Sequence, residues 1–167
     1  MSQEHPDCHI DISPGGTSCE FVAYAWPPAA QVAPQWPISP GAVRFGSDGR
    51  PELLHFAPGR WLAPGVSPAQ VTDWCESADA PAGSLVDVSG KWDSVQVHGI
   101  AAARLLASTI DVEQVLDQRE CAAVTLFDCP AILARAPNGY LLWVQSSYTS
   151  DFLTAATRTR AMLEGCS

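Results

Sequence analysis

Charge is scarce in this chain of 167 residues, and lysine is almost absent. Charged residues make up 16% of the sequence, Lys91 is the only lysine, and the net charge is −9. Soluble domains usually carry about 25% charged residues, so the low fraction indicates that a partner protein covers part of the surface. Nucleic acids and anionic membranes are bound through clusters of Lys and Arg. The sequence contains no such cluster, which argues against both kinds of partner.

Targeting and membrane-spanning segments are missing as well. Residues 1–7 contain neither a basic region nor an apolar run, so they do not resemble a signal peptide. The longest apolar stretch, residues 21–30, contains Pro27 and Pro28 and is shorter than the roughly 20 residues that cross a bilayer as a helix. We therefore expect a cytoplasmic protein, in which the six cysteines are free thiols.

Motifs for cofactor binding or catalysis are also lacking. The sequence has no glycine-rich dinucleotide fingerprint, no phosphate-binding P-loop, no His-Glu-x-x-His and no Gly-x-Ser-x-Gly. Cys121 or Cys129 could act as a nucleophile with His98 as its base, but cysteine is more often a buried core residue. Asp87 ends a predicted strand, where it could orient a ligand or cap the next turn. We expect that the chain itself is not catalytic.

The N-terminal residues 1–19 are polar, contain scattered glycine and are predicted to form a flexible arm. His5, Cys8, His9 and Cys19 have the side chains that zinc prefers, and the His-x-x-Cys pair could supply two ligands. Their spacing fits no familiar zinc finger, and incidental Cys and His in a mobile arm are the alternative. We expect no metal here, and these four residues are the candidate ligands if one is bound.

The remaining residues, 20–167, are predicted to form a single α+β domain of antiparallel sheets with a few covering helices. Alternating apolar and polar residues predict strands over 20–26, 43–45, 52–56, 85–89, 94–98, 122–127, 132–136 and 140–144. Helices are predicted over 67–77, where Ser67 and Pro68 form a start signal, over 100–108, and from Ser147 or Ser150 to about 163. Residues 128–130 are predicted to form a break between the strands 122–127 and 132–136. Asn138-Gly139 predicts a type I′ turn.

Residues 27–41 are rich in proline and contain Trp36. Such a segment is extended and costs little entropy to order, so it could present the tryptophan to a partner or wrap over its own core. The chain has six tryptophans, and this residue is enriched at protein interfaces. We predict that Trp36, Trp61, Trp92 and Tyr148 contact a partner.

Short motifs follow one another through the second half of the chain. They are Leu85-Val86-Asp87-Val88-Ser89, Val95-x-Val97-x-Gly99, Ala102-x-x-Leu105-Leu106-Ala107 with Asp111, Cys121-Ala122-x-x-Thr125-Leu126, and Tyr140-x-Leu142-x-Val144-x-x-Ser147-Tyr148-x-x-x-Phe152-Leu153. Upstream, Ala57-Pro58-Gly59-Arg60-Trp61-Leu62 is a variant of a Gly-Pro-Asp-x-Trp-Leu turn. On these motifs the chain resembles the γ subunit of heterotetrameric sarcosine oxidase over residues 57–163, and best over 84–167.

This resemblance implies a fold like that of the folate-binding domain of aminomethyltransferases, and an accessory role. In that family the γ subunit binds no cofactor and packs against the large subunit. FAD, FMN, NAD, tetrahydrofolate and zinc are held by the partner subunits, which oxidise the amine. The chain would thus be a non-catalytic subunit of a multi-subunit flavin- and folate-linked oxidase or demethylase of N-methylated amines.

The sequence departs from the family in two places. Gly59 stands where an acidic residue is expected, and Glu120 precedes Cys121 where family members often carry Arg. These differences leave the amine open: sarcosine, dimethylglycine, dimethylamine or N-methylglutamate. The alternative function is a stand-alone tetrahydrofolate-binding protein of the aminomethyltransferase-like group, in which Asp87 or Asp111 would hold the pterin edge.

Overall fold

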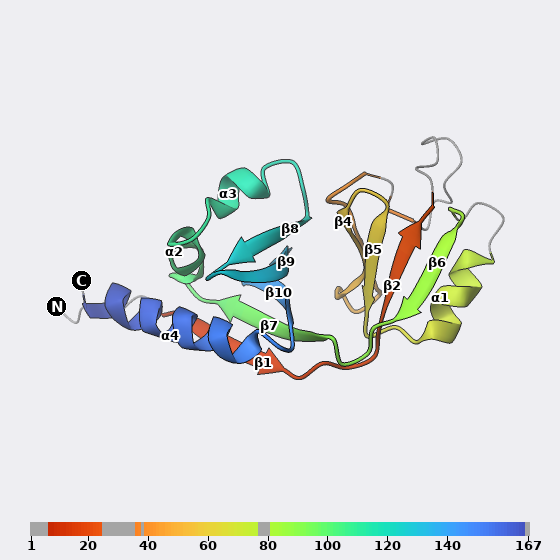
Figure 1. The fold of residues 1–167 in the computed structure, drawn as a ribbon. Helices are drawn as coiled ribbons and strands as arrows, with labels where there is room; N and C mark the ends of the chain where they lie inside the picture. The colour runs from red at the N-terminus through yellow and green to blue at the C-terminus, as the bar shows by residue number, and fades with distance from the viewer. Residues whose placement is uncertain (1–6, 25–35, 38, 77–80, 166–167) are drawn as a thin grey trace.

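Two antiparallel sheets of five strands each form the framework of the residues that the structure describes. The computed structural model describes residues 7–24, 36–37, 39–76 and 81–165. Within these ranges the sheets lie beside each other, one helix packs on the second sheet, and three helices accompany the first (Figure 1). The α+β class predicted from the sequence is confirmed.

The elements have the following bounds. The first sheet contains, in spatial order, β1 (His9–Ser13), β7 (Trp92–His98), β10 (Gly139–Gln145), β9 (Cys129–Ala136) and β8 (Cys121–Leu126). The second sheet contains β3 (Val43–Phe45), β4 (Pro51–Ala57), β5 (Arg60–Pro64), β2 (Ser18–Ala23) and β6 (Gly83–Asp87). The helices are α1 (Pro68–Cys75), α2 (Ala102–Ala107), α3 (Val112–Val115) and α4 (Thr149–Gly165).

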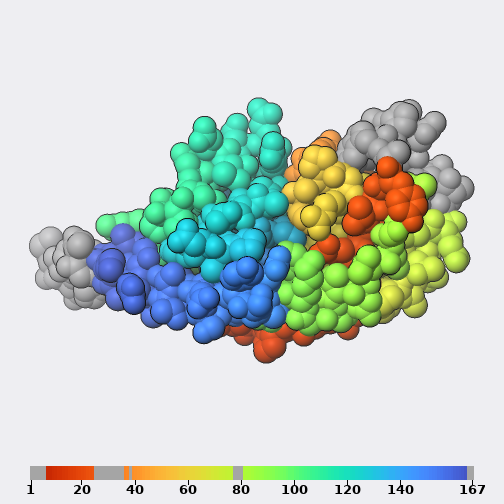
Figure 2. Space-filling view, viewed as in Figure 1, coloured from red at the N-terminus to blue at the C-terminus, as the bar shows by residue number. Residues whose placement is uncertain are grey.

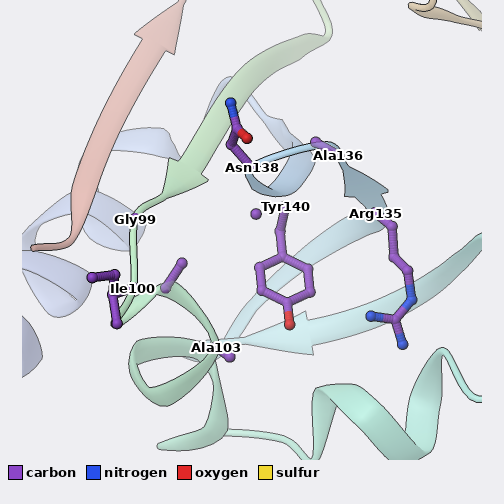
Figure 3. Close-up of a pocket in the computed structure, with 9 residues that line it drawn as sticks. Gly99, Ile100, Ala103, Arg135, Ala136, Asn138 and Tyr140 are labelled. Atoms are coloured by element: carbon purple, nitrogen blue, oxygen red, sulfur yellow. The ribbon is translucent and has the colours of Figure 1, made fainter.

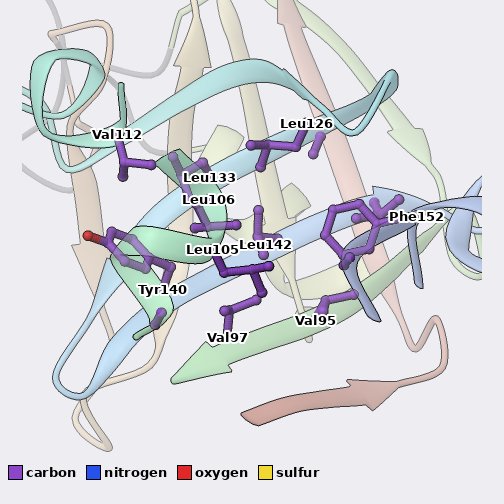
Figure 4. Close-up of a cluster of buried hydrophobic side chains, with 14 of the residues drawn as sticks. Val95, Val97, Leu105, Leu106, Val112, Leu126, Leu133, Tyr140, Leu142 and Phe152 are labelled. Atoms are coloured by element: carbon purple, nitrogen blue, oxygen red, sulfur yellow. The ribbon is translucent and has the colours of Figure 1, made fainter. Parts of the chain in front are cut away.

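Strand alternation divides the first sheet between two cores. On β10, Tyr140, Leu142 and Val144 point into the core beneath α2, α3 and α4 (Figure 4). Trp143, between them, points to the other face, where it joins a cluster with Leu62 and other residues of the second sheet. Successive side chains of a strand point to opposite faces, so one strand serves the helix-covered core and also the contact between the sheets.

A separate core lies between the second sheet and α1. Phe21, Trp36 and Trp61 are packed there at ring distances of 4.9 to 5.7 Å, with Val71 of α1 buried beside them. Aromatic rings in tilted or edge-to-face contact bury large areas and add specific attraction. This core covers one face of the second sheet, and the other face meets the first sheet.

Helix α1 begins where the sequence predicts. The Ser67 hydroxyl accepts a hydrogen bond from the Gln70 N–H at 3.3 Å, and the Gln70 side chain accepts one from the Ser67 N–H at 3.3 Å. These reciprocal bonds form a capping box, and Pro68 occupies the first helical position. The final helix differs from the prediction, because α4 begins at Thr149 rather than after Ser147 or Ser150.

The prediction of a flexible arm over residues 1–19 is wrong for the part that the structure describes. Residues 9–13 form β1, which pairs with β7 from His9↔His98 to Ser13↔Ser94. The chain then crosses to the second sheet at β2 and returns to the first after β6. The polar residues that suggested an arm reflect an exposed edge strand, because such a strand has little surface to bury.

Two turns also differ from the predictions. Leu126 pairs with Cys129, so Phe127 and Asp128 form a two-residue turn, with φ of 50° and 61°. Both residues are left-handed, as in a type I′ turn, and β9 runs unbroken from Cys129, although residues 128–130 were predicted to interrupt it. The other hairpin turns through residues 137–138, and its glycine, Gly139, already belongs to β10.

Candidate functional site

An open groove of about 530 Å³ is lined by residues from both sheets. Its floor comes from β7 and β10, one wall from β1, and the other wall from the loop between β3 and β4. Trp143 and Leu141 supply apolar surface on the floor, while Gln96 and Asp11 supply polar groups beside it. The lining residues are Asp11, Ser13, Phe45, Asp48, Gly49, Arg50, Pro51, Pro64, Gly65, Ser94, Gln96, Arg135, Ala136, Pro137, Leu141 and Trp143.

The charges in the groove are paired. Arg50 lies 3.7 Å from Asp48, and Arg135 lies 3.0 Å from Glu113. Asp11 Oδ2 lies 2.7 Å from His98 Nε2. A groove with an apolar floor and paired charges suits a flat ring or an extended peptide segment better than a strongly anionic ligand.

A shallower pocket of about 300 Å³ lies beside the β9–β10 hairpin and the start of α2 (Figure 3). Near it, the Tyr140 hydroxyl donates to Glu113 at 3.0 Å, and Arg135 also donates to Glu113, at 3.0 Å. The bond from Arg135 and then that from Tyr140 lower the pKa of Glu113. Burial, followed by the bond to Glu113, raises the pKa of Tyr140. The phenol therefore stays neutral, and the cluster ties α3 to the hairpin rather than supplying a base.

The thiols considered as nucleophiles are held protonated. Burial raises the pKa of Cys121 to about 12, with the charge of Glu120 adding to the effect. Burial also raises the pKa of Cys129. The two thiols belong to cores on opposite faces of the first sheet, and His98 bonds Asp11 instead. Since the thiolate is the nucleophile, neither cysteine is prepared for catalysis.

The structure separates the candidate metal ligands. Cys8 is buried in the core of the first sheet and Cys19 in that of the second. The His9 ring stacks on His98 at 5.1 Å, and His5 lies outside the described residues. Among the residues that the structure describes, no group of three or more His, Cys, Asp or Glu is placed to hold a metal ion.

Both aspartates proposed for pterin binding act as caps. Asp87 accepts from the Ser89 hydroxyl at 2.6 Å and from its N–H at 2.9 Å, and these two bonds lower the pKa of Asp87. Asp111 accepts from the Gln114 N–H at 3.1 Å, at the start of α3. Asp87 ends β6 of the second sheet, whereas Asp111 precedes α3, which accompanies the first sheet. The two aspartates therefore do not share a site.

Three of the four residues predicted to contact a partner are core residues. Trp36, Trp61 and Trp92 are 2%, 1% and 8% exposed, respectively. The prediction for them is corrected, because their indoles fill the protein's own cores. Tyr148 is 41% exposed and remains available to a partner. The other large apolar side chains that reach the surface are Ile12, Tyr24, Phe45, Val86, Ile100 and Met162.

One buried charge cluster, around Glu20, was not among the sites predicted from the sequence. Glu20 on β2 is 5% exposed. It accepts from Lys91 at 2.6 Å, from Arg60 at 2.9 Å and from the Trp92 indole N–H at 3.1 Å. Lys91 precedes β7 and Trp92 is its first residue. Glu20 of the second sheet is therefore bonded to the first sheet. A lone Glu opening an apolar strand was the available sign.

The comparisons with known proteins give a match at the level of the fold. No protein-family model matches the chain, and no curated protein does. A chain of heterotetrameric sarcosine oxidase from Corynebacterium sp. U-96, solved in complex with pyrrole 2-carboxylate, superimposes with a TM-score of 0.74. The match covers 96% of this chain and 87% of that chain, at 18% sequence identity. The two chains share their fold.

At this identity the likeness establishes the fold alone. It extends over nearly the full length of both chains, so the two chains are also similar in size. Within the described residues, no helix is long and apolar enough to cross a membrane.

Proposed function

We propose that this chain is a non-catalytic accessory subunit, of the γ type, in a cytoplasmic flavin- and folate-linked oxidase or demethylase of N-methylated amines. The observation that carries the proposal is the shared fold with a chain of a heterotetrameric sarcosine oxidase along 96% of this chain. The match also covers 87% of the sarcosine oxidase chain, so most of that chain's fold has a counterpart here.

The placement of the polar residues supports this role. Asp87 and Asp111 act as caps, Cys121 and Cys129 are protonated thiols, and Glu20 is enclosed by cations and an indole. Each group is occupied in holding the fold together. In the proposed complex, FAD, FMN, NAD, tetrahydrofolate and zinc reside in the partner subunits, and this chain stabilises the large subunit.

The test is to purify the tagged chain from its native cells and to analyse the eluate by mass spectrometry and absorbance. We expect larger chains in a fixed ratio and the yellow absorbance of a bound flavin, since flavins carry the redox chemistry of such enzymes. An unrelated tagged protein of similar acidity is the control for non-specific capture. A colourless chain without stoichiometric partners would overturn the proposal.

The non-catalytic role is tested on the purified complex. Dissociating this chain should leave amine turnover by the remaining subunits measurable while lowering their melting temperature, because a bound partner stabilises only the folded state. Loss of turnover at a temperature where the remaining subunits are still folded would show that the chain contributes to the chemistry itself.

The groove favours one alternative, a stand-alone tetrahydrofolate-binding protein. Asp11, whose carboxylate also contacts His98, and Trp143, which is only 4% exposed, both line the groove and are the groups that a pterin ring would meet there. Tetrahydrofolate at 100 times its Kd would stabilise the isolated chain by about 2.7 kcal/mol, or roughly 5–10 °C in Tm for a domain of this size. The Gln96→Ala variant, which changes an exposed residue of the groove floor, should reduce the shift. An unchanged Tm excludes this function.

A further inference from the structure

Strand β1 forms an open edge of the first sheet. It pairs with β7 on one side, and no described strand pairs with its other side. Figure 4 shows it outside β7, and in Figure 2 its red atoms lie along the lower margin of the molecule. An open edge exposes backbone N–H and C=O groups that can pair with another chain.

The hydrogen bonds between β7 and β10 show which backbone groups of β7 face β1. At one end of this ladder the Gly99 N–H donates to the Asn138 carbonyl, and at the other the Ser146 N–H donates to the Lys91 carbonyl. In an antiparallel ladder such bonds flank non-hydrogen-bonded pairs. The pair Gly139↔His98 is therefore of this type, as is every second pair along the ladder. His98, Gln96 and Ser94 consequently direct their backbone groups toward β1.

The same alternation fixes the orientation of β1. His9, Asp11 and Ser13 lie opposite those three β7 residues and share their backbone bonds. Ile10 and Ile12 therefore direct their N–H and C=O groups outward. Within the described ranges, no hydrogen bond from outside the β1–β7 ladder reaches these groups.

One end of the outward-facing edge is already occupied. Cys8 lies two residues before Ile10, so by the same alternation its carbonyl also points away from β7. This carbonyl accepts a hydrogen bond from Arg160 Nη1 of α4 at 3.3 Å. The free portion of the edge is thus confined to Ile10 and Ile12. Natural edge strands are commonly protected by charged side chains, proline or a bulge. Strand β1 is short, carries Asp11 and is followed by Pro14, but residues 9–13 themselves contain no lysine, proline or bulge.

The side chains of β1 give the edge two different faces. Ile10 packs against the helix-covered core and Ile12, on the same face, is 40% exposed. On the opposite face the Asp11 side chain is 71% exposed. An added strand would therefore place apolar side chains beside Ile12 and a complementary charge beside Asp11.

We infer that β1 accepts an extended segment of a partner subunit, which adds a strand to the first sheet beyond Ile10 and Ile12. The inference rests on the proposed accessory role. In this segment a Lys or Arg faces Asp11, and the residues on either side of it in the sequence are apolar. Main-chain hydrogen bonds to a sheet edge supply affinity in this mode of recognition, and alternate side chains supply specificity.

A second copy of the chain is a poorer occupant. If two β1 strands paired antiparallel with Ile10 opposite Ile12, each Asp11 would lie directly opposite the other. Like charges in this position are destabilising, and each chain brings a net charge of −9. A partner segment with basic side chains would instead be attracted to Asp11 at the same edge.

Two substitutions test the edge without disturbing the ladder. Ile12→Pro removes an outward N–H and leaves the β1–β7 bonds intact, since Ile12 does not share them. Ile12→Val keeps the N–H and is the matched control. Asp11→Lys reverses the charge on the partner-facing side and also removes the 2.7 Å contact of Asp11 with His98, so its effect on the isolated chain is measured first. The isolated variants should melt within about 3 °C of the unchanged chain, as surface substitutions at edges do.

The native complex supplies the readout. The tagged variants are expressed with the untagged chain in native cells, and incorporation into the complex is quantified by mass spectrometry. We expect Ile12→Pro and Asp11→Lys each to lower incorporation on the order of 10-fold, as loss of one backbone bond or one charge contact predicts. Ile12→Val should be incorporated normally. Hydrogen exchange across residues 8–14 should be slower in the complex than in the isolated chain.

The outcomes separate the two proposals. Equal incorporation of all variants and unchanged exchange in a complex that contains flavoprotein chains would overturn the edge inference while the accessory role stands. Absence of partner chains would overturn both. If the isolated chain forms a dimer in which hydrogen exchange of residues 8–14 is slow, then the edge pairs with a second copy of the chain. That result would overturn the inference of a partner-subunit segment.

Discussion

Replacing Glu20 by glutamine should destabilise the protein, because this residue links the two sheets. The carboxylate accepts from Lys91, Arg60 and the Trp92 indole, and its side chain is only 7% exposed. A hydrogen bond to a charged group contributes about 1.5–3 kcal/mol. The side chains of Arg60 and Lys91 are 47% and 39% exposed, so water replaces part of their lost interaction.

After this discount we expect Glu20→Gln to lower the free energy of unfolding by about 2 kcal/mol. For a domain of this size that corresponds to a fall in Tm of roughly 4–8 °C. Thermal unfolding followed by circular dichroism measures the change. Asp48→Asn is the control, because Asp48 and Arg50 have side chains that are 63% and 87% exposed, and such surface pairs contribute about 0–1 kcal/mol.

The effect should also depend on pH. Burial raises the pKa of Glu20, but the bonds from Lys91 and Arg60, the charge of Lys91 and the bond from Trp92 outweigh it, so the net pKa is lowered. The stabilisation is therefore fully present above the unfolded-state pKa of about 4.3 and is lost as pH falls through the lower folded-state pKa. The difference between the two proteins should shrink on acidification. Equal effects of Glu20→Gln and Asp48→Asn at neutral pH would refute the argument.

Three further outcomes are expected. Gly139→Ala should lower Tm by several degrees in thermal melts, because a Cβ would lie 2.3 Å from the Val97 carbonyl at a φ of +148°; unchanged melting would contradict the close approach. Asp128→Gly should raise stability in urea titrations by up to about 1 kcal/mol, because φ there is 61°, and a loss would show that the Asp side chain matters more. At pH 8 iodoacetamide should leave Cys121 unmodified in the folded protein, because the pKa of this thiol is about 12. In urea the same reagent should modify it, and mass spectrometry distinguishes the two results. Rapid labelling of the folded protein would contradict the burial of Cys121.

Much of the fold follows from local patterns in the sequence. Ser67-Pro68 marks the start of α1, and alternation in residues 140–144 identifies β10 and both of its faces. These features are local, so one segment suffices to predict them. The grouping of strands into two sheets depends on pairings such as His9↔His98, which no local pattern contains.

Turn chemistry accounts for the clearest local errors. Phe127 and Asp128 both have left-handed backbones without the Asn-Gly pair that favours this conformation. The Phe127 ring packs edge-to-face on Phe152 at 5.4 Å, so tertiary packing compensates for the unfavourable backbone. Conversely, Asn138-Gly139 matches the preferred pair, yet Gly139 is needed where its backbone approaches β7.

The candidate site was less predictable than the fold. Composition suggested that tryptophans face a partner, whereas Trp61 and Trp36 occupy a core beneath α1. Burial depends on which face of a sheet is covered, and for Trp36 and Trp61 this is decided by how α1 packs on the second sheet. The capping roles of Asp87 and Asp111, by contrast, follow from the residues just after each.

The position of β1 has a consequence for synthesis on the ribosome. Its partner strand, β7, begins at Trp92, and β10, at the centre of that sheet, ends at Gln145. The second sheet, from β2 to β6, is complete by Asp87, and can assemble while β1 still has no neighbour. Of the described strands, β1 is therefore the first to be synthesised and among the last to be paired, and a nascent-chain binding factor would find residues 9–13 unpaired until β7 has emerged.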